Sequence, residues 1–235
     1  MNSKIKKTCV IMQPTYLPWV GYFDLIHRSD VFVFLNDVQF SKQSWQVKNK
    51  IISQGNELTL TVPIKKASLS TIIDQIIIDD SQPWRKKHLK SIYYSYIKTP
   101  FFEEVFPVIE RVINNKSNCL ADFNVEIIKI LSNRIFEKSF FIDSRHLKIY
   151  SKDKLDRIIK ICQEVGATDY LSPAGSVAYL ESMNYEQRFL NAAIKLSIQD
   201  YSPKKYTQLN QPFKPFLSII DLLFNKGFEK AKTII

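Results

Sequence analysis

The sequence predicts an α/β fold with a mostly parallel sheet and a helical insert. Strand-like and helix-like segments alternate along residues 1–80 and again along residues 140–235, which is the order of an α/β core. Residues 81–138 carry helical patterns. Because glycine occurs only five times and no low-complexity tract interrupts the chain, we expect a single domain over residues 1–235 without flexible linkers.

Residues 1–80 supply the first strands of the expected core. Two continuous apolar runs predict buried strands, and a run that alternates leucine and valine with threonine predicts a half-buried strand. An amphipathic helix is expected between the first two strands. We therefore expect strands at residues 8–12, 31–35, 57–62 and 72–78, and a helix at residues 21–28.

Residues 81–138 are predicted to form the helical insert. Asp80 and Ser81 are plausible capping residues for its first helix, with Pro83 in the first turn. In the last helix, apolar residues recur at helical spacing. The expected helices are residues 83–98, 101–114 and 120–136.

Residues 140–235 return to alternating strands and helices. Gly166 and Gly227 are placed to end two of the helices, since glycine readily adopts the left-handed conformation that terminates a helix. The expected strands are residues 140–143 and 169–171, and the expected helices are residues 151–165, 174–180 and 213–225.

The chain is basic and poor in cysteine. Its formal net charge of +10 attracts polyanions such as nucleic acid, anionic lipid or phosphorylated small molecules, although a solvated basic surface is an equal alternative. The three cysteines are far apart and form no CxxC pair, which argues against a disulfide framework and a thiolate zinc site. No secretory signal and no membrane-spanning apolar run are visible, so we expect a cytoplasmic protein.

Sequence motifs for metals, cofactors and covalent catalysis are missing. The three histidines are not spaced as metal ligands, and neither GxGxxG nor GxSxG occurs. We therefore expect no metal, no bound cofactor and no covalent mechanism.

The order strand, turn, helix, strand at the N-terminal end predicts a Rossmann-like core. The first strand runs into Gln13, and the second ends at Asn36-Asp37. In nucleotide-binding folds of this order, ligands lie beyond the carboxyl ends of the strands. The segment is loosely similar to the nucleotidyltransferase (HUP-like) pattern, in which a Gly-His pair opens the helix. Here Gly21-Tyr22 stands in that place, which argues against adenylyl transfer by that mechanism.

The turn before the first helix carries candidate binding residues. The rings of Tyr16, Trp19 and Tyr22, with Gln13 beside them, are suited to stacking on a base or a sugar face. Alternatively, Trp19 and Tyr22 are half-buried core residues.

The end of the second strand carries the first candidate catalytic residue. Asp37 is suited to act as a general base or to orient a sugar hydroxyl, and the alternative is a turn aspartate bonded to its own backbone. Gln39, Trp45 and Asn49 add neutral polar groups and one more ring, which are typical of a carbohydrate site and also of an ordinary loop.

His88 is the second candidate catalytic residue. It shares a helix face with Trp84, and it is suited to act as an acid, a base or an anion contact. A packing or surface histidine is the alternative.

Two later segments carry further candidate binding residues. The loop Ser172–Ser176, with Gly175, precedes a helix whose N–H groups could hold a phosphate; a tight turn with a capping serine is the alternative. Asp221 and Asn225 would project from one helix face, either to line the site or, as we favour, to tie the helix to neighbouring loops. Tyr206 and Gln208 are placed to cover the cleft.

Two long motifs, MQPTYLPWVGYFDLI and SDVFVFLNDVQFSKQSWQVKNKI, resemble the WbqC-like family. Later segments agree, including LTVPI, PWRKKHLKSIYYSY, ICQEVGATDYLSPAGSVAYL and PFLSIIDLLFNKG, so the resemblance covers nearly the whole chain. The family often has an acidic pair in place of Asn36-Asp37, and arginines in place of Lys48 and Lys50. Lysine lacks the planar fork of arginine, which disfavours a bidentate phosphate contact there.

The resemblance implies work on an activated sugar in bacterial O-antigen or surface-polysaccharide synthesis. We hypothesise a transferase that acylates or aminoacylates the amine of a nucleotide-linked amino sugar. Asp37 or His88 would accept the proton of the amine. The sugar or base would stack on the rings of Tyr16, Trp19 and Trp45. The phosphates would contact Lys48, Lys50 and the Ser172–Ser176 loop. The donor would be an aminoacyl-tRNA or another activated acyl compound.

Two other functions remain open at this point. The alternative hypothesis is a non-catalytic protein of a polysaccharide pathway that binds a sugar nucleotide or a protein partner. A nucleic-acid-binding module is less favoured, because no motif of that kind occurs and the basic residues form no single stripe.

Overall fold

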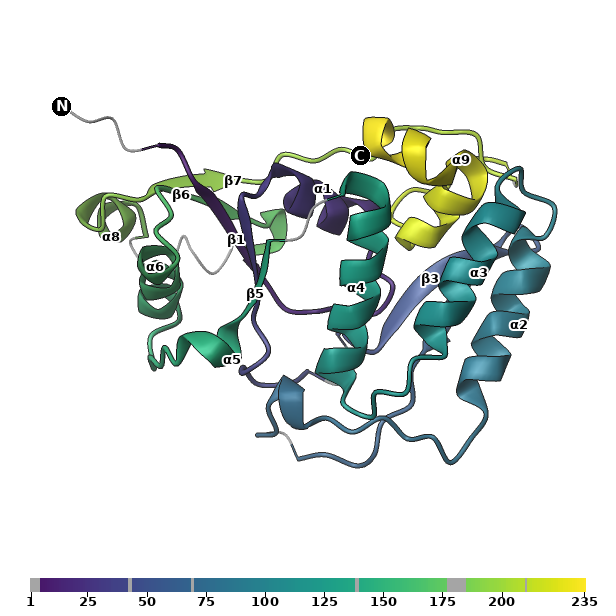
Figure 1. The fold of residues 1–235 in the computed structure, drawn as a ribbon, viewed down its shortest axis with the longest axis horizontal. Coiled ribbons are helices and arrows are strands. Elements are labelled where there is room, and N and C mark those ends of the chain that lie inside the picture. The colour runs from purple at the N-terminus through teal and green to yellow at the C-terminus, as the bar shows by residue number, and fades with distance from the viewer. Residues whose placement is uncertain (1–4, 42–43, 69, 138–139, 177–184, 210) are drawn as a thin grey trace. The chain divides into compact units, whose positions relative to one another are not determined.

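The computed structural model describes residues 5–41, 44–68, 70–137, 140–176, 185–209 and 211–235 (Figure 1). The chain divides into two compact units. The sheet unit comprises Met1–Gln13, Asp24–Asp37 and Phe140–Ser202, and the helical unit comprises Pro14–Phe23, Val38–Ser139 and Pro203–Ile235. The expectation of a single domain, with a core at residues 1–80 and 140–235 and an insert at 81–138, stays a prediction.

Five parallel strands form the sheet of the sheet unit, in the order β5-β2-β1-β6-β7. β1 (Thr8–Met12) is central and pairs with β2 (Val31–Phe34) on one side and with β6 (Asp169–Ser172) on the other. The outer strands are β5 (Phe141–Asp143), beside β2, and β7 (Lys195–Ile198), beside β6. The sheet confirms the predicted α/β class with a mostly parallel, Rossmann-like core.

Apolar residues on the strands and on one helix make the core of the sheet unit. β2 is buried along its whole length, as its continuous apolar sequence predicts for a strand in the middle of a parallel sheet. α6 (Lys154–Glu164) contributes Ile158 and Ile161 to the same core as Ile11 and Val33. α5 (Ser144–Leu147), the 3-10 helix η2 (Ala174–Ser176) and α8 (Tyr185–Asn191) complete the described helices of this unit.

A two-stranded hairpin lies in the helical unit. β3 (Lys48–Ser53) pairs antiparallel with β4 (Asn56–Thr61) through a two-residue turn at Gln54-Gly55. Both turn residues have positive φ, 51° and 79°, which is the conformation of the type I′ turn that matches the twist of a hairpin.

The other elements of the helical unit are helices. α1 (Val20–Arg28) begins in this unit and ends in the sheet unit. α3 (Phe102–Ile113) contacts both α2 (Trp84–Tyr96) and α4 (Leu120–Phe136), and Figure 1 shows the three side by side. α9 (Ile219–Ile234) contacts α3 and α4, and its Phe224 ring stacks on Tyr96 with 4.5 Å between ring centroids.

Two of the expected elements were wrong. Residues 72–78 form no strand: they contain the 3-10 helix η1 (Ile73–Gln75), flanked by single bridges to three different segments. The apolar side chains of Ile73, Ile76 and Ile78 are buried although the segment does not pair with a neighbouring strand. The last helix starts at Ile219, not at residue 213, because the hydroxyl of Ser218 caps it by accepting from the Ile220 N–H. The predicted end at Gly227 is confirmed, because Gly227 has non-helical backbone angles and a second helical segment follows it as far as Ile234.

Other differences are smaller. Asp80 and Ser81 do not cap α2, whose N-cap is Pro83; instead the Asp80 carboxylate accepts from the indole N–H of Trp84 at 2.7 Å. β3 and β7 were not expected, because β3 mixes lysines with isoleucines and β7 is only half-buried. The helix expected at residues 174–180 begins as η2, and its later residues lie outside the described part of the chain.

Gly227 makes a kink in α9 that a side chain would disturb. Its φ of 74° is in the left-handed region, and an added Cβ would lie 2.7 Å from the Phe101 ring. We expect Gly227→Ala to lower the free energy of unfolding by about 2 kcal/mol or more, from backbone strain and from the clash together. Urea denaturation measures the loss. Gly55→Ala is the matched control: φ is 79° but nothing lies within 4 Å of a new Cβ, so about 1 kcal/mol is expected. Equal losses would contradict the role of the Phe101 contact.

Candidate functional site

The carboxyl ends of the five parallel strands gather polar residues at one edge of the sheet. Gln13 follows β1, Asn36 and Asp37 follow β2, and Ser172 ends β6. From β1 the chain continues to β2 and β5 on one side of the sheet, and from β6 it continues to β7 on the other side. The direction of the connections therefore reverses between β1 and β6. This is the switch point at which open α/β sheets bind ligands. Gln13 and Ser172 flank it.

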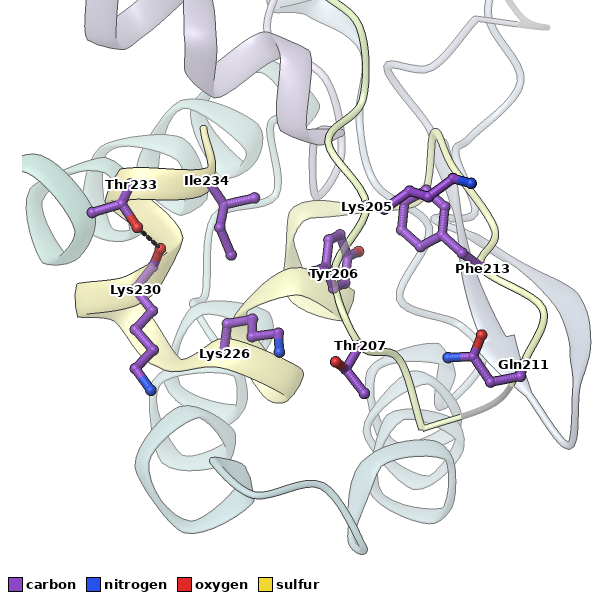
Figure 2. A pocket seen from close by; sticks show the side chains of 9 residues that line it. All are labelled: Lys205, Tyr206, Thr207, Gln211, Phe213, Lys226, Lys230, Thr233 and Ile234. Atoms are coloured by element: carbon purple, nitrogen blue, oxygen red, sulfur yellow. Dashed lines mark hydrogen bonds between the residues drawn. The ribbon is translucent and has the colours of Figure 1, made fainter.

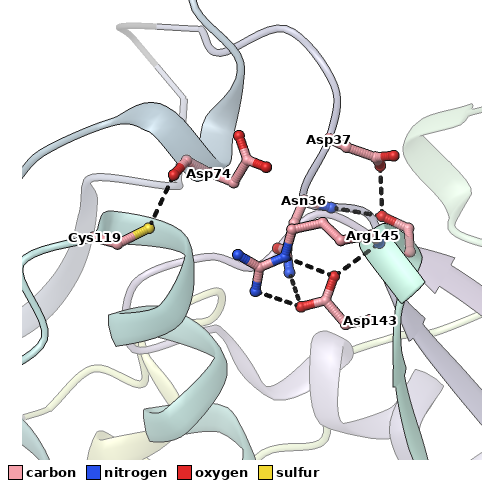
Figure 3. Close-up of polar contacts among 7 residues, drawn as sticks. Asn36, Asp37, Asp74, Cys119, Asp143 and Arg145 are labelled. Carbon is pink, nitrogen blue, oxygen red and sulfur yellow. Dashed lines mark hydrogen bonds and ion pairs between the residues drawn. The ribbon is translucent and has the colours of Figure 1, made fainter. Parts of the chain in front are cut away.

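Asn36, Asp143 and Ser144 join the ends of β2 and β5 (Figure 3). The side-chain amide of Asn36 donates to Asp143 at 2.7 Å, and its backbone N–H donates to the Ser144 hydroxyl at 3.1 Å. Arg145 donates to Asp143 from Nε at 3.0 Å and from Nη2 at 2.6 Å. Burial acts to raise the pKa of the Asp143 carboxyl, but the hydrogen bonds from Arg145 and Asn36 outweigh it and lower that pKa.

The Asp37 carboxylate holds two partners within the sheet unit. The Ser144 hydroxyl donates to Oδ1 at 2.5 Å, and the Arg157 guanidinium lies 2.5 Å from Oδ2. Arg157 also donates to the Asp37 carbonyl at 3.4 Å. Asp37 is therefore more than a turn aspartate bonded to its own backbone, because it ties β2 to α5 and α6. To accept a proton from a substrate, its carboxylate must exchange one of these partners.

Three buried polar atoms at this edge form no hydrogen bond with the described residues. They are the Ser172 hydroxyl, Asn36 Oδ1 and Arg157 Nε. Buried polar atoms are almost always paired, with protein or with an ordered water or ligand. Ser172 and Asn36 are both fully buried, at 0% exposure. The sheet edge thus has a hydroxyl, an amide oxygen and a guanidinium N–H with no hydrogen-bond partner among the described residues.

The loop after β6 begins with a tight turn. Ser176 N–H donates to the Pro173 carbonyl at 3.0 Å, which closes a turn around the exposed Gly175. Phosphate binding by this loop stays a prediction.

Tyr16, Asn49 and His88 meet inside the helical unit. The Tyr16 hydroxyl lies 2.9 Å from His88 Nδ1, and the Asn49 amide donates to the carbonyls of Tyr16 and Leu17 at 3.1 and 2.8 Å. Burial lowers the pKa of His88 to about 4. A hydrogen bond to the Thr61 backbone acts in the opposite direction but is the smaller effect. His88 is therefore neutral near pH 7. Tyr22 is also buried, so the structure places these side chains in packing positions.

The remaining N-terminal candidates differ in exposure. The Trp19 indole packs against Gly21, where it leaves no room for a Cβ, and against the Phe216 ring. Trp45 is 50% exposed, Gln39 is exposed, and Lys48 is half-buried at the start of β3. Among these rings, Trp45 offers the largest surface to a ligand.

Asp221 is the centre of a buried hydrogen-bond network. Its carboxylate accepts from the hydroxyls of Tyr96 and Tyr206 at 3.0 and 2.7 Å and from the Gln208 amide at 2.8 Å. The Asn225 amide donates to the Asp221 carbonyl at 2.7 Å. Burial raises the pKa of the Asp221 carboxyl, and the three hydrogen bonds act against that rise. The three bonds of the Asp221 carboxylate tie α9 to α2 and to the segment around residue 206, whereas the Asn225 bond stays within α9.

The WbqC-like protein family model matches residues 13–233, which include every candidate site residue named in this section. The chain belongs to the WbqC-like family. A relative, the "Uncharacterized protein Rv1507c" of Mycobacterium tuberculosis (strain ATCC 25618 / H37Rv), is 28% identical over 226 residues, which cover 95% of each chain. No solved structure matches this chain.

The identity of residue 36 has a structural explanation. The Asn36 amide donates to the Asp143 carboxylate. An acid at position 36 would face the Asp143 carboxylate and raise the pKa of one of the two groups. Asn36 avoids that repulsion.

The structure also adds residues that sequence reasoning missed at this site: Asp143, Ser144, Arg145 and Arg157. Asp143 and Ser144 follow a predicted strand, so the rule that selected Asp37 also applies to them. Arg157 lies on a helix far along the chain and carried no such signal.

Metal ligands and membrane helices are not found in the described part of the chain. No group of three or more histidine, cysteine, aspartate or glutamate side chains is placed there to hold a metal ion. No helix among the described residues is long and apolar enough to cross a lipid bilayer.

Proposed function

We propose that this WbqC-like protein binds a nucleotide-linked amino sugar at the carboxyl edge of its parallel sheet and transfers an acyl or aminoacyl group to the sugar amine. The observation that carries the binding proposal is the buried, uncommitted hydroxyl of Ser172 beside the switch point of the sheet. A nucleotide in this position would meet Gln13 and the Ser172–Ser176 loop, where turn N–H groups suit phosphate oxygens.

Asp37 is the better of the two proposed proton acceptors. His88 is buried, has a pKa of about 4 and already faces Tyr16 at Nδ1. Asp37 stands at the sheet edge, and its partner Ser144 supplies a hydroxyl through which a proton can pass. In the proposed step the sugar amine attacks the acyl carbonyl and the C–N bond forms. The bond from the acyl carbon to the donor oxygen breaks, and the amine proton passes to Asp37, which then gives a proton to the leaving oxygen.

Ser172→Ala tests the binding part of the proposal. In the wild-type protein the Ser172 hydroxyl pairs with no described residue. We therefore expect the variant's free energy of unfolding without ligand to differ from that of the wild type by less than about 0.5 kcal/mol. A nucleotide-linked amino sugar at 100 times its dissociation constant stabilises the native protein by about 2.7 kcal/mol, and the variant should lose most of this stabilisation. Thermal unfolding with a panel of 3-amino and 4-amino nucleotide sugars and their parent nucleotides measures both.

Ser197→Ala, on the neighbouring strand β7, is the matched control and should keep the full ligand effect. The proposal fails if no nucleotide sugar stabilises the wild-type protein, or if Ser172→Ala keeps the same stabilisation as Ser197→Ala.

Binding without turnover is the second candidate function. This function is favoured because both oxygens of the Asp37 carboxylate already interact, one with the Ser144 hydroxyl and the other with the Arg157 guanidinium. Mass spectrometry of the sugar after incubation with an activated acyl donor separates the two functions, because only a transferase adds the acyl mass. Loss of that product after RNase treatment would identify aminoacyl-tRNA as the donor.

A further inference from the structure

The outer face of α2 in the helical unit is basic and exposed. Lys86, Lys87 and Lys90 lie within an arc of about 120° on the helix, together with the exposed rings of Tyr93 and Tyr94. α2 contains no acidic residue, and none of the three lysines forms an ion pair with a described residue. A positive face without counter-charges fits a negatively charged partner.

The outer face of the neighbouring helix, α3, is acidic. Glu103, Glu104 and Glu110 are exposed, and within the described part of the chain none of them forms an ion pair. Arg111 is the only basic residue of α3. It lies two turns from Glu104 on the same side of the helix, whereas Glu103 and Glu110 lie two turns apart on another side. That side therefore carries negative charge alone.

Aromatic rings lie between the basic face and the acidic face. Tyr93 packs edge-on against Phe102 and Phe106 of α3, with 5.4 and 5.6 Å between ring centroids, and against Tyr94 at 5.4 Å. Tyr93 and Tyr94 are 37% and 68% exposed, and Phe106 is half-buried. These four rings form a partly exposed aromatic seam along the contact between α2 and α3. A solvent-exposed apolar patch with charged borders is typical of a protein interface.

The two faces are complementary to each other in a second copy of the chain. α2 and α3 are joined by a short connection and run antiparallel, side by side (Figure 1). Lys90 and Lys86 lie about 5 and about 10 Å along α2 from Tyr93, and Glu110 lies about 6 Å along α3 from Phe106 in the same direction. A two-fold axis along the seam places α3 of one copy on α2 of the other at the same height. Lys86 and Lys90 of each copy then face Glu110 of the other.

We propose that two copies of this chain associate through the outer faces of α2 and α3, with the aromatic seams in contact at the two-fold axis. Helices of 13 and 12 residues give a face of about 20 by 20 Å. This area is smaller than the roughly 800 Å² that each partner buries in a standard interface. We therefore expect a dissociation constant on the order of 10 µM. The association does not depend on the function proposed above.

Sedimentation velocity of the full chain, from about 1 to about 200 µM, tests the proposal because this range brackets the expected constant. We expect the double variants Lys86→Glu/Lys90→Glu and Glu103→Lys/Glu110→Lys to associate about 30-fold more weakly than the wild type. Each reversed charge counts twice across a two-fold axis, and each exposed ion pair contributes about 2- to 3-fold. An equimolar mixture of the two variants should associate again, because in the mixed dimer the reversed charges face charges of opposite sign.

Lys65→Glu/Lys66→Glu is the matched control. It makes the same change of charge at exposed lysines of the helical unit outside α2 and α3, and it should associate like the wild-type protein. Thermal unfolding of the monomeric variants should match that of the wild type, because exposed substitutions change stability little.

Three results would contradict the proposal. One is a wild-type protein that stays monomeric at about 200 µM, well above the expected constant. Another is a control variant that loses association as strongly as Lys86→Glu/Lys90→Glu, which would indicate a general charge effect. The third is a mixture of the two reversed variants that stays monomeric. If the wild-type protein is monomeric and binds vesicles of anionic lipid, and Glu103→Lys/Glu110→Lys binds them more tightly, the face is a membrane surface instead.

Discussion

Replacing Asp221 with alanine is expected to lower the free energy of unfolding by about 4 kcal/mol, because three hydrogen-bond donors lose their acceptor at once. The donors are the hydroxyls of Tyr96 and Tyr206 and the amide of Gln208. Tyr96 and Gln208 are 2% and 4% exposed, so water does not readily replace the lost carboxylate. Each unpaired buried donor costs about 1–3 kcal/mol.

Urea denaturation of variants at this position measures the loss and its origin. Asp221→Asn keeps one acceptor oxygen but turns an N–H group toward another donor, so a loss of about half that of the alanine variant is expected. Glu229→Ala, an exposed acid on the same helix, is the control and should change the free energy by less than about 0.5 kcal/mol. If Asp221→Ala lost less than about 1 kcal/mol, the network would not be what holds the residue 206 segment to α9.

The Asp221 network also positions Tyr206. The Tyr206 hydroxyl donates to Asp221 at 2.7 Å, and its ring lines a surface pocket together with Phe213 and Lys226 (Figure 2), so the position of the ring depends on that bond. Tyr206→Phe removes one hydrogen bond and keeps the ring, and its loss should be about 1 kcal/mol. Comparing the Asp221 variants with Tyr206→Phe therefore separates the contribution of one bond from that of the whole network.

The elements that the sequence predicted well are those with a local cause. β1 and β2 are continuous apolar runs, α4 has apolar residues at helical spacing, and Gly166 ends α6 with a φ of 67°. The rule that ligands lie at strand ends selected Asp37, and the small-residue loop before a helix selected Ser172. Both residues lie at the carboxyl edge of the sheet.

The features that the sequence did not predict arise from contacts between distant segments. Residues 72–78 have the composition of a strand, but they pair by single bridges with three different segments. Arg157 reaches Asp37 from a helix 120 positions away. The helical segment after Gly227 was also not expected, and the Phe101 ring packs beside Gly227 from a distant part of the chain.

His88 predicts how stability depends on pH. The folded-state pKa of about 4 lies below the ordinary value of 6.5, because the side chain is buried. Between these two values the unfolded chain binds a proton that the folded protein does not, so stability falls as the pH decreases. We expect His88 alone to remove about 2.5 kcal/mol between about pH 7.5 and about pH 4.5.

The His88→Gln variant should lose this part of the pH dependence. Glutamine does not titrate, so the variant is expected to be less stable near neutral pH, because a buried ring contact with Trp84 is lost, but flatter in its pH profile. His146→Gln, at an exposed position, should keep the wild-type profile. Urea unfolding at a series of pH values measures all three proteins. A His88→Gln profile as steep as that of His146→Gln would mean that His88 does not stay neutral in the fold. Such a result would make His88 a proton acceptor in the proposed transfer again. A flattened profile would mean that His88 is a neutral packing residue bonded to Tyr16 and that Asp37 is the proton acceptor.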